Sequence, residues 1–210
     1  MTGANTKDIA RVLGTGIEDA SVKAAKRFAG LADADLLAKV VYAPYDSPLG
    51  RGYVAATRRG IVGVALPGRS EDAFLTELAD GVSPRVLEQP QRLDEARRQL
   101  DQYFAGNRTR FELSVDWSLV KADFYGRVLR QTAKLPYGVT STYGEVAARA
   151  GNPRAFRAAG TALATNPIPL VVPCHRVLRA GGVLGGYGGG PEMKRFLLEL
   201  EGAIEVDLPT

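Results

Sequence analysis

Apolar and polar positions alternate in two ways along the chain, and the change of pattern divides it into two regions. From about Lys39 to Trp117, short β-branched or apolar runs stand between Ser-Pro and Arg-Gly turns, which is typical of an antiparallel sheet. Residues 1–38 are Ala-rich, with a helical or partly disordered pattern and no recognisable chemistry. The expected strands are KVVYAPY, RGYVAAT, GIVGVAL and RFELSVDW, and the expected helices are SEDAFLTELAD and LDEARRQLDQYFAG. The region is therefore predicted to be a small α/β unit.

After about Ser118 the pattern becomes helical. The segment ADFYGRVLRQTAKL is predicted to be a helix that a Pro-Tyr-Gly turn closes. Thr142 and Glu145 have the T-x-x-E spacing of a capping box, so the next helix is expected to begin there. Gly151 is expected to end it.

A second short helix is expected to follow, with Asn152 as its cap and Pro153 at its first position, and to run to about Thr165. Two short helices joined by a Gly-containing turn form a helix-turn-helix, whose second helix lies against DNA. Its side chains are small, and Arg154 and Arg157 are expected to share one face. The alternative is an Ala-rich helix packed against its neighbour, with both arginines in solvent.

Composition limits the chemistry of the chain. It has 210 residues, one Cys and one His, so an intramolecular disulfide and a Cys/His zinc site are excluded. The N-terminus lacks the pattern of a signal peptide, and no apolar run is long enough to span a bilayer. These features fit a protein of a reducing cytoplasm with no membrane partner. A carboxylate metal site is not excluded by composition, but no motif suggests one, so no metal is expected.

The positive charge lies in the second half of the chain. Residues 1–117 carry 16 basic and 16 acidic side chains, whereas residues 118–210 carry 11 and 7. A basic half beside a neutral half favours an anionic partner, of which nucleic acid is the obvious candidate. On charge alone, a basic surface without such a partner is an equal alternative.

The only cysteine and the only histidine, Cys174 and His175, are neighbours. A thiolate is the nucleophilic form of cysteine, so a reactive Cys174 needs help to lose its proton. Adjacent side chains do not normally point the same way, so contact with His175 is either direct or through water. Pro173 predicts a backbone break before Cys174, and if a helical turn follows, its dipole would help to lower the thiol pKa. The alternative is a structural cysteine buried behind the apolar run IPLVV.

Seven of the ten residues from Gly181 to Gly190 are glycines, which predicts a loop with unusual backbone angles. The loop matches neither a phosphate loop nor a dinucleotide fingerprint. It is interpreted either as a mobile lid beside a reactive site or as a linker. A helix from Pro191 to Leu200 is expected after it, with Glu201 at its end.

The segment VVPCHRVL, preceded by YGEVAARAGNPRAFRAAGTALATNPIP and followed by GGYGGG and KRFLLELEG, resembles the O6-alkylguanine-DNA alkyltransferases, or methylated-DNA–protein-cysteine methyltransferases. The resemblance runs from about Asp123 to Gly202. YDSPLGRGYVAATRRGIVGVAL resembles the family's N-terminal sheet in outline. The resemblance implies a ribonuclease-H-like α/β domain with a small antiparallel sheet and helices. A mainly α domain with a winged-helix-like helix-turn-helix is implied after it.

The resemblance also implies a set of site residues. Cys174 would attack the alkyl carbon, His175 would act as its base through water, and Glu201 would orient the imidazole. Tyr143 would donate to the departing guanine, and Asn166 would tie the turn to the active-site segment. Arg157 would fill the stack in place of the flipped base. The other implied DNA-binding residues are Asn152, Arg154, Ala155, Tyr187, Gly188 and Gly189.

The implied function is single-turnover transfer of an alkyl group from O6-alkylguanine in duplex DNA, approached through the minor groove, to Cys174. No cofactor is implied, and cooperative self-association on DNA is a further possibility. The alternatives are a lesion sensor that flips the base without transfer, and a cysteine hydrolase. The expected division is an extension over 1–38, the α/β domain over 39–117, the alkyltransferase domain over 118–204 and a tail over 205–210.

Overall fold

The computed structural model describes residues 38–205, and from Val40 onward these described residues belong to one compact unit. The extension predicted over residues 1–38 and the tail predicted over 205–210 therefore lie almost wholly outside the described residues. Within the described part, no helix is long and apolar enough to cross a membrane.

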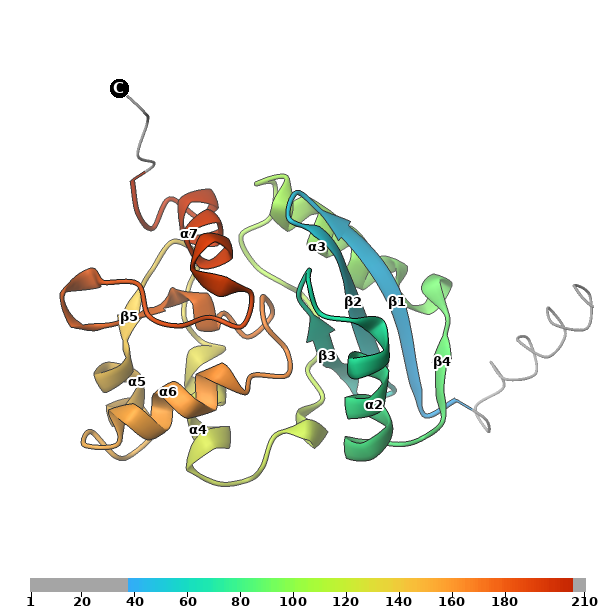
Figure 1. The fold of residues 1–210 in the computed structure, drawn as a ribbon, viewed down its shortest axis with the longest axis horizontal. Coiled ribbons are helices and arrows are strands. Elements are labelled where there is room, and N and C mark those ends of the chain that lie inside the picture. Colours follow the sequence, from blue (N-terminus) through green and yellow to red (C-terminus); the bar gives the residue numbers. More distant parts are fainter. Residues whose placement is uncertain (1–37, 206–210) are drawn as a thin grey trace, which may run out of the picture. The chain divides into compact units, whose positions relative to one another are not determined.

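The first half of the unit is built on a four-stranded sheet with the order β3-β2-β1-β4 (Figure 1). The three strands predicted from KVVYAPY, RGYVAAT and GIVGVAL are confirmed, and they pair as antiparallel hairpins. A fourth strand, which the sequence analysis missed, pairs parallel to β1, so the sheet is mixed rather than purely antiparallel. The strands are β1 (Val40–Ser47), β2 (Gly50–Thr57), β3 (Gly60–Ala65) and β4 (Val86–Glu88).

The strand predicted for RFELSVDW is wrong. Only Val115 of this segment forms a bridge, with Ile61 at the edge of the sheet. The backbone N–H of Ile61 donates to Ser114 and that of Asp116 donates to Ile61, both at 2.8 Å. Farther back, the Gln99 side chain accepts the N–H of Glu112. These local contacts satisfy the backbone groups that a continuous ladder would otherwise have to pair.

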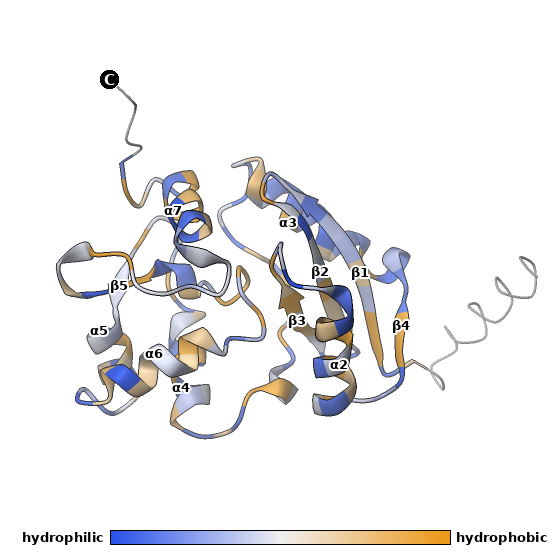
Figure 2. Ribbon diagram, viewed as in Figure 1, coloured by the Kyte–Doolittle hydropathy of each residue, from blue (hydrophilic) through white to orange (hydrophobic). Residues whose placement is uncertain are grey.

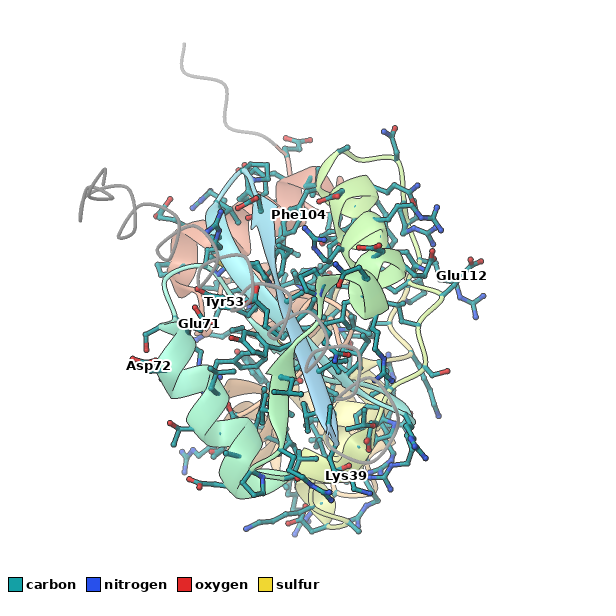
Figure 3. All side chains as sticks on the ribbon, turned by 90° about the vertical axis from the view of Figure 1, so that its right-hand side faces the viewer. Lys39, Tyr53, Glu71, Asp72, Phe104 and Glu112 are labelled. Atoms are coloured by element: carbon teal, nitrogen blue, oxygen red, sulfur yellow. The ribbon has the colours of Figure 1, made fainter. Side chains whose placement is uncertain are left out.

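Helices α2 (Glu71–Gly81) and α3 (Asp94–Phe104) cover the two faces of the sheet. Successive side chains of a strand point to opposite faces. On β1, the Tyr42 hydroxyl donates to Glu71 of α2, whereas the Tyr45 ring stacks on Phe104 of α3 at 6.3 Å. Figure 3 shows these helices on either side of the strands, and Figure 2 shows the hydrophobic residues along β1, β3 and β4. Because both faces are covered, β1 is nearly continuously apolar.

The second half is mainly helical, as expected, and carries a two-stranded parallel pair of β5 with β6. The capping box is confirmed: the Thr142 hydroxyl accepts the Glu145 N–H, and the Glu145 carboxylate accepts the Thr142 N–H at 3.0 Å. The helices are α4 (Phe124–Thr132), α5 (Tyr143–Arg149), α6 (Phe156–Ala164) and α7 (Gly190–Leu200), and the short strands are β5 (Ser141–Thr142) and β6 (Val177–Leu178). The single 3₁₀ turns are η1 (Pro90–Leu93), η2 (Trp117–Leu119), η3 (Cys174–Arg176) and η4 (Ala180–Gly182).

Helix α6 begins at Phe156, three residues after the predicted start at Pro153. Asn152 forms a turn instead of a helix cap: its side-chain oxygen accepts the Arg154 N–H and its carbonyl accepts the Ala155 N–H. An Asn side chain that bonds its own neighbouring backbone favours a turn over a helix. Arg154 therefore lies before α6, and the expectation that it shares a helical face with Arg157 is wrong.

The capping box positions the first residue of α5, which lies beside the site described below. We expect Thr142→Ala to lower the free energy of unfolding by about 1 kcal/mol, because the Glu145 N–H loses its acceptor, the Thr142 hydroxyl. Chemical denaturation measures this change. The matched control is Thr76→Ala on α2, whose exposed hydroxyl donates only to the Asp72 carbonyl. An equal effect of the two substitutions would contradict the stabilising role of the box.

Candidate active site

Cys174 and His175 form the first two residues of η3, directly after Pro173. Both side chains are buried, Cys174 with 6% of its surface exposed and His175 with none. A helical turn thus follows the backbone break expected at Pro173. It leads into β6, which pairs with β5 immediately before α5. This pairing brings the Cys-His turn to the start of the helix-turn-helix.

Asn166 joins the end of α6 to the cysteine. Its side-chain NH₂ donates to the Val172 carbonyl at 2.9 Å and to Cys174 Sγ at 3.2 Å, and its side-chain oxygen accepts the Ile168 N–H. The same loop is held from the sheet, because the N–H of Val64 on β3 donates to the Pro167 carbonyl at 2.8 Å. One amide thus fixes both the loop that returns to Cys174 and the sulfur itself.

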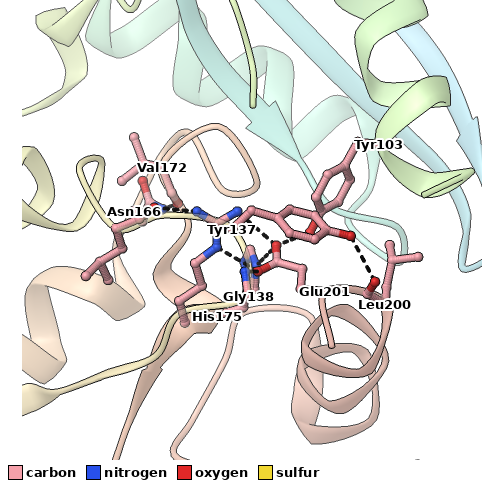
Figure 4. Close-up of polar contacts among 10 residues, drawn as sticks. Tyr103, Tyr137, Gly138, Asn166, Val172, His175, Leu200 and Glu201 are labelled. Atoms are coloured by element: carbon pink, nitrogen blue, oxygen red, sulfur yellow. Dashed lines mark hydrogen bonds and ion pairs between the residues drawn. The ribbon is translucent and has the colours of Figure 1, made fainter. Parts of the chain in front are cut away.

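The carboxylate of Glu201, at the end of α7, is the centre of a buried polar network (Figure 4). Oε1 accepts from Tyr103 Oη at 2.7 Å, from His175 Nε2 at 2.8 Å and from Arg176 Nη2 at 2.9 Å. Oε2 accepts from Arg176 Nε at 2.8 Å and from the Gly138 N–H at 3.2 Å. Burial alone would raise the pKa of Glu201, but the donors from His175 and Arg176 outweigh burial and hold the pKa at about 2.

His175 is oriented by this network. A carboxylate only accepts hydrogen bonds, so Nε2 of the imidazole carries the proton that it shares with Glu201. The buried Nδ1 has no hydrogen-bond partner among the described residues, which leaves it as the basic nitrogen. Burial lowers the pKa of His175, and the Glu201 carboxylate opposes that change. The imidazole is thus neutral, fixed in direction and able to accept a proton at Nδ1.

The N–H groups of the turn lower the thiol pKa of Cys174, as expected, but the net change is upward. Burial raises the pKa of Cys174, and this outweighs the opposing effects of the Asn166 amide, Lys194 and the N–H groups of the turn. A fully buried thiolate is costly because the surroundings solvate it poorly. Cys174 is therefore held as a thiol, and its activation requires transfer of the proton to a base.

Lys194 on α7 is a site residue that the sequence analysis missed. Its side chain has no exposed surface, Nζ donates to the Val177 carbonyl at 2.6 Å, and the ammonium lies 6.0 Å from the centre of the Tyr143 ring. Burial lowers its pKa to about 8, while Cys174 opposes the change. Lys194 lies three and four residues before the buried Leu197 and Leu198, so helical periodicity could have placed it on the apolar face.

A pocket of about 1070 Å³ lies between α5, α6 and the glycine-rich loop. Of the predicted site residues, Tyr143, Arg157, Tyr187 and Gly188 line it, together with the exposed Phe156. Arg157 is exposed, and its guanidinium lies 5.6 Å from the centre of the Phe156 ring. The Tyr187 ring meets His175 edge-on at 6.3 Å, which connects this wall of the pocket to the Cys-His turn.

The glycine-rich loop is packed against the site. A Cβ on Gly185 would come within 2.3 Å of the Tyr143 hydroxyl, so only glycine allows this close approach. Gly188 and Gly189 also line a smaller pocket of about 550 Å³ that includes Asn166. Three predicted DNA-binding residues, Asn152, Arg154 and Ala155, line neither pocket; they form the turn before α6.

The described residues contain no cluster of His, Cys, Asp and Glu that could hold a metal. Of the ten basic residues between Arg127 and Arg195, two are internal, because Arg176 pairs with Glu201 and Lys194 is buried. Arg176 and Glu201 cancel in the net charge of this half, whereas the buried Lys194 makes that net charge larger than the charge of its surface. Arg157 and Arg179, both exposed, are the basic residues that line the larger pocket.

Lys194 supports the anionic form of Cys174 while its own ammonium is charged, below a pH of about 8. We expect Lys194→Met, which keeps the length of the side chain and removes the charge, to slow the alkylation of Cys174 by iodoacetamide at pH 7, where the ammonium is charged. The alkylation rate measured against pH shows the effect, and the difference should vanish above pH 9, where Lys194 is neutral. Lys134→Met, at an exposed position, is the control. Equal rates at pH 7 in the Lys194 variant and the unaltered protein would exclude this role.

Comparison with known proteins agrees with this geometry. The description "6-O-methylguanine DNA methyltransferase, DNA binding domain" matches residues 123–203, and "6-O-methylguanine DNA methyltransferase, ribonuclease-like domain" matches residues 40–117. A methylated-DNA–protein-cysteine methyltransferase of Methanosarcina acetivorans is 39% identical over 163 residues, which are 77% of this chain and 98% of the relative.

A methylated-DNA–protein-cysteine methyltransferase of Mycobacterium bovis is 52% identical over 103 residues, 49% of this chain and 61% of the relative. Among solved structures, Mycobacterium tuberculosis OGT in complex with DNA superimposes with a TM-score of 0.67 at 37% identity, over 78% of this chain and 93% of that one. The expected fold is confirmed by these structures, and the chain belongs to the 6-O-methylguanine DNA methyltransferase family.

Proposed function

We propose that the protein is a DNA repair alkyltransferase, which takes the alkyl group from O6-alkylguanine, chiefly O6-methylguanine, onto its own Cys174. The observation that carries the proposal is the arrangement around the sulfur. Cys174 Sγ accepts a hydrogen bond from Asn166, and its neighbour His175 is held by Glu201, with Nδ1 unpartnered among the residues that the structure describes. A nucleophile, a base and a group that orients the base stand together beside a pocket large enough for a nucleobase.

The transfer is a direct displacement. His175 Nδ1 takes the proton of Cys174 through a water molecule, and the sulfur then forms a bond to the alkyl carbon. The bond from that carbon to O6 breaks, and its electron pair stays on the guanine. Tyr143, which lines the pocket, donates a hydrogen bond to the base as it leaves. The thioether has no hydrolytic step, so each molecule acts once.

DNA reaches the pocket from the side of α6. The O6 atom is inaccessible to a nucleophile inside the duplex, so the base has to be flipped out. Helix α6 enters the minor groove, and Arg157 fills the space that the flipped guanine leaves. Tyr187 and Gly188 line the base pocket, and Gly189 follows them in the loop. Asn152, Arg154 and Ala155, in the turn before α6, lie against the DNA backbone. Neighbouring molecules associate on the DNA, and the protein works in the cytoplasm.

The proposed division of labour follows the expected boundaries. Residues 39–117 form the ribonuclease-H-like domain, and residues 118–204 form the helix-turn-helix alkyltransferase domain that carries Cys174. The extension over 1–38 and the tail over 205–210 have no proposed role.

The first test is the intact mass of the protein after incubation with duplex DNA that contains O6-methylguanine. We expect the mass of one methyl group to be added, to map to Cys174, and to be absent in Cys174→Ala. Tight binding to the damaged duplex without any change of mass would identify a lesion sensor instead. Release of a modified product with repeated turnover would identify a hydrolase.

The second test separates base flipping from chemistry. We expect Arg157→Ala to slow transfer from duplex DNA by about 10-fold or more, because the stack loses the group that replaces the flipped base. Reaction with free O6-benzylguanine should change little, because that base needs no flipping. Arg154→Ala, before the helix, is the matched control and should have a smaller effect on the duplex reaction. Equal losses on both substrates would refute the role of Arg157.

A further inference from the structure

We propose that Tyr103 of α3 is a positioning residue of the active site, which acts through Glu201 and sets how strongly that carboxylate holds His175. This inference rests on the proposed function, because it concerns the same proton transfer. It assigns to the first half of the chain a part in the chemistry of Cys174, which the second half carries.

The hydroxyl of Tyr103 reaches the network from a distant part of the sequence. It donates to Glu201 Oε1 at 2.7 Å, across a separation of 98 residues (Figure 4). The side chain is 1% exposed, and its ring packs against Phe104, Phe111 and Tyr137. These contacts leave the hydroxyl one direction, toward the carboxylate.

Tyr103 and His175 donate to the same oxygen atom. A carboxylate oxygen has about two lone-pair sites, whereas Oε1 accepts from three donors, Tyr103, His175 and Arg176. Each donor withdraws negative charge from Oε1, so each weakens the hydrogen bonds that the other two donors make to this atom. Loss of the Tyr103 hydroxyl leaves more of the charge to His175 and favours the imidazolium form.

The donor is constant over the working range of pH. Burial raises the pKa of Tyr103, and the Glu201 charge raises it further, so the phenol stays protonated. The groups that face His175 have to be considered together, because each influences its titration. They are Glu201 and Lys194 from α7, Arg176 and Cys174 from η3, Tyr187 from the glycine-rich loop and, through Glu201, Tyr103 from α3.

The test compares Tyr103→Phe with Tyr45→Phe. Both substitutions remove one buried hydroxyl from the same half of the protein, but Tyr45 donates to the Ala65 carbonyl and does not touch the network. The first measurement is the pH dependence of methyl transfer in a single turnover. The second is the NMR signal of the imidazole, which needs no assignment because His175 is the only histidine.

In Tyr103→Phe, we expect the acid limb of the transfer rate to move to higher pH by about half a unit, since His175 must be neutral to accept the proton. The Nε2 proton should move downfield as its bond to Glu201 strengthens. Tyr45→Phe should change neither quantity. Profiles and imidazole signals in Tyr103→Phe that coincide with those of the unaltered protein would overturn the proposal.

A second variant, with 3-fluorotyrosine at position 103, keeps the ring and the hydroxyl and therefore serves if Tyr103→Phe does not fold. The shifts expected from it are opposite in sign to those expected from Tyr103→Phe. Its phenol is a stronger donor, so the acid limb should move to lower pH and the Nε2 proton upfield. No movement, or movement in the other direction, would again overturn the proposal. The imidazole signal is independent of alkyl transfer: if the unaltered protein transfers no methyl group, the proposed function fails while the NMR comparison still tests Tyr103.

Discussion

The rest of the structure depends on the hydrogen bonds and the ion pair that surround the buried carboxylate of Glu201. A buried charge is tolerated only where donors surround it, and removal of one partner of a buried pair costs about 3–5 kcal/mol. Glu201 obtains its donors from α3, from the loop after α4 and from the Cys-His turn, through Tyr103, Gly138, His175 and Arg176. The carboxylate therefore joins the sheet-bearing half to the helical half and holds His175, the proposed base. Stability and chemistry are coupled through it.

The proposed proton transfer to His175 is compatible with the burial of Cys174. Burial raises the pKa of Cys174 and keeps it as a thiol, which protects it from unwanted reactions. The Asn166 amide and Lys194 oppose burial, and the neutral His175 offers Nδ1 to the proton. The thiolate is thus formed only together with proton transfer, beside the pocket that holds the base. A protein that reacts once gains from a nucleophile that stays protonated until its substrate arrives.

Local signals in the sequence predicted local structure well. Thr142 and Glu145 identify the start of α5, because a capping box needs only residues three apart. The start of α6 was placed too early, because Asn152 bonds its own neighbours and forms a turn. Tyr103 was not predicted as a site residue, because its partner Glu201 is 98 residues away in the sequence. Lys194 was not predicted either, because its partner is a backbone carbonyl. The pairing of Glu201 with His175 followed from family resemblance, since spacing alone does not specify a contact across 26 residues.

The most direct test of the role of Glu201 is the free energy of unfolding against pH, for the unaltered protein and for Glu201→Gln. The pKa of Glu201 is about 2 in the folded protein and 4.5 in the unfolded chain. The carboxylate therefore makes its full contribution to the free energy of unfolding above pH 4.5, and this contribution is lost as the pH falls toward 2. The shift corresponds to about 3 kcal/mol. We expect Glu201→Gln to be less stable at neutral pH and to lack this part of the acid dependence. The same acid dependence in both proteins would contradict the account.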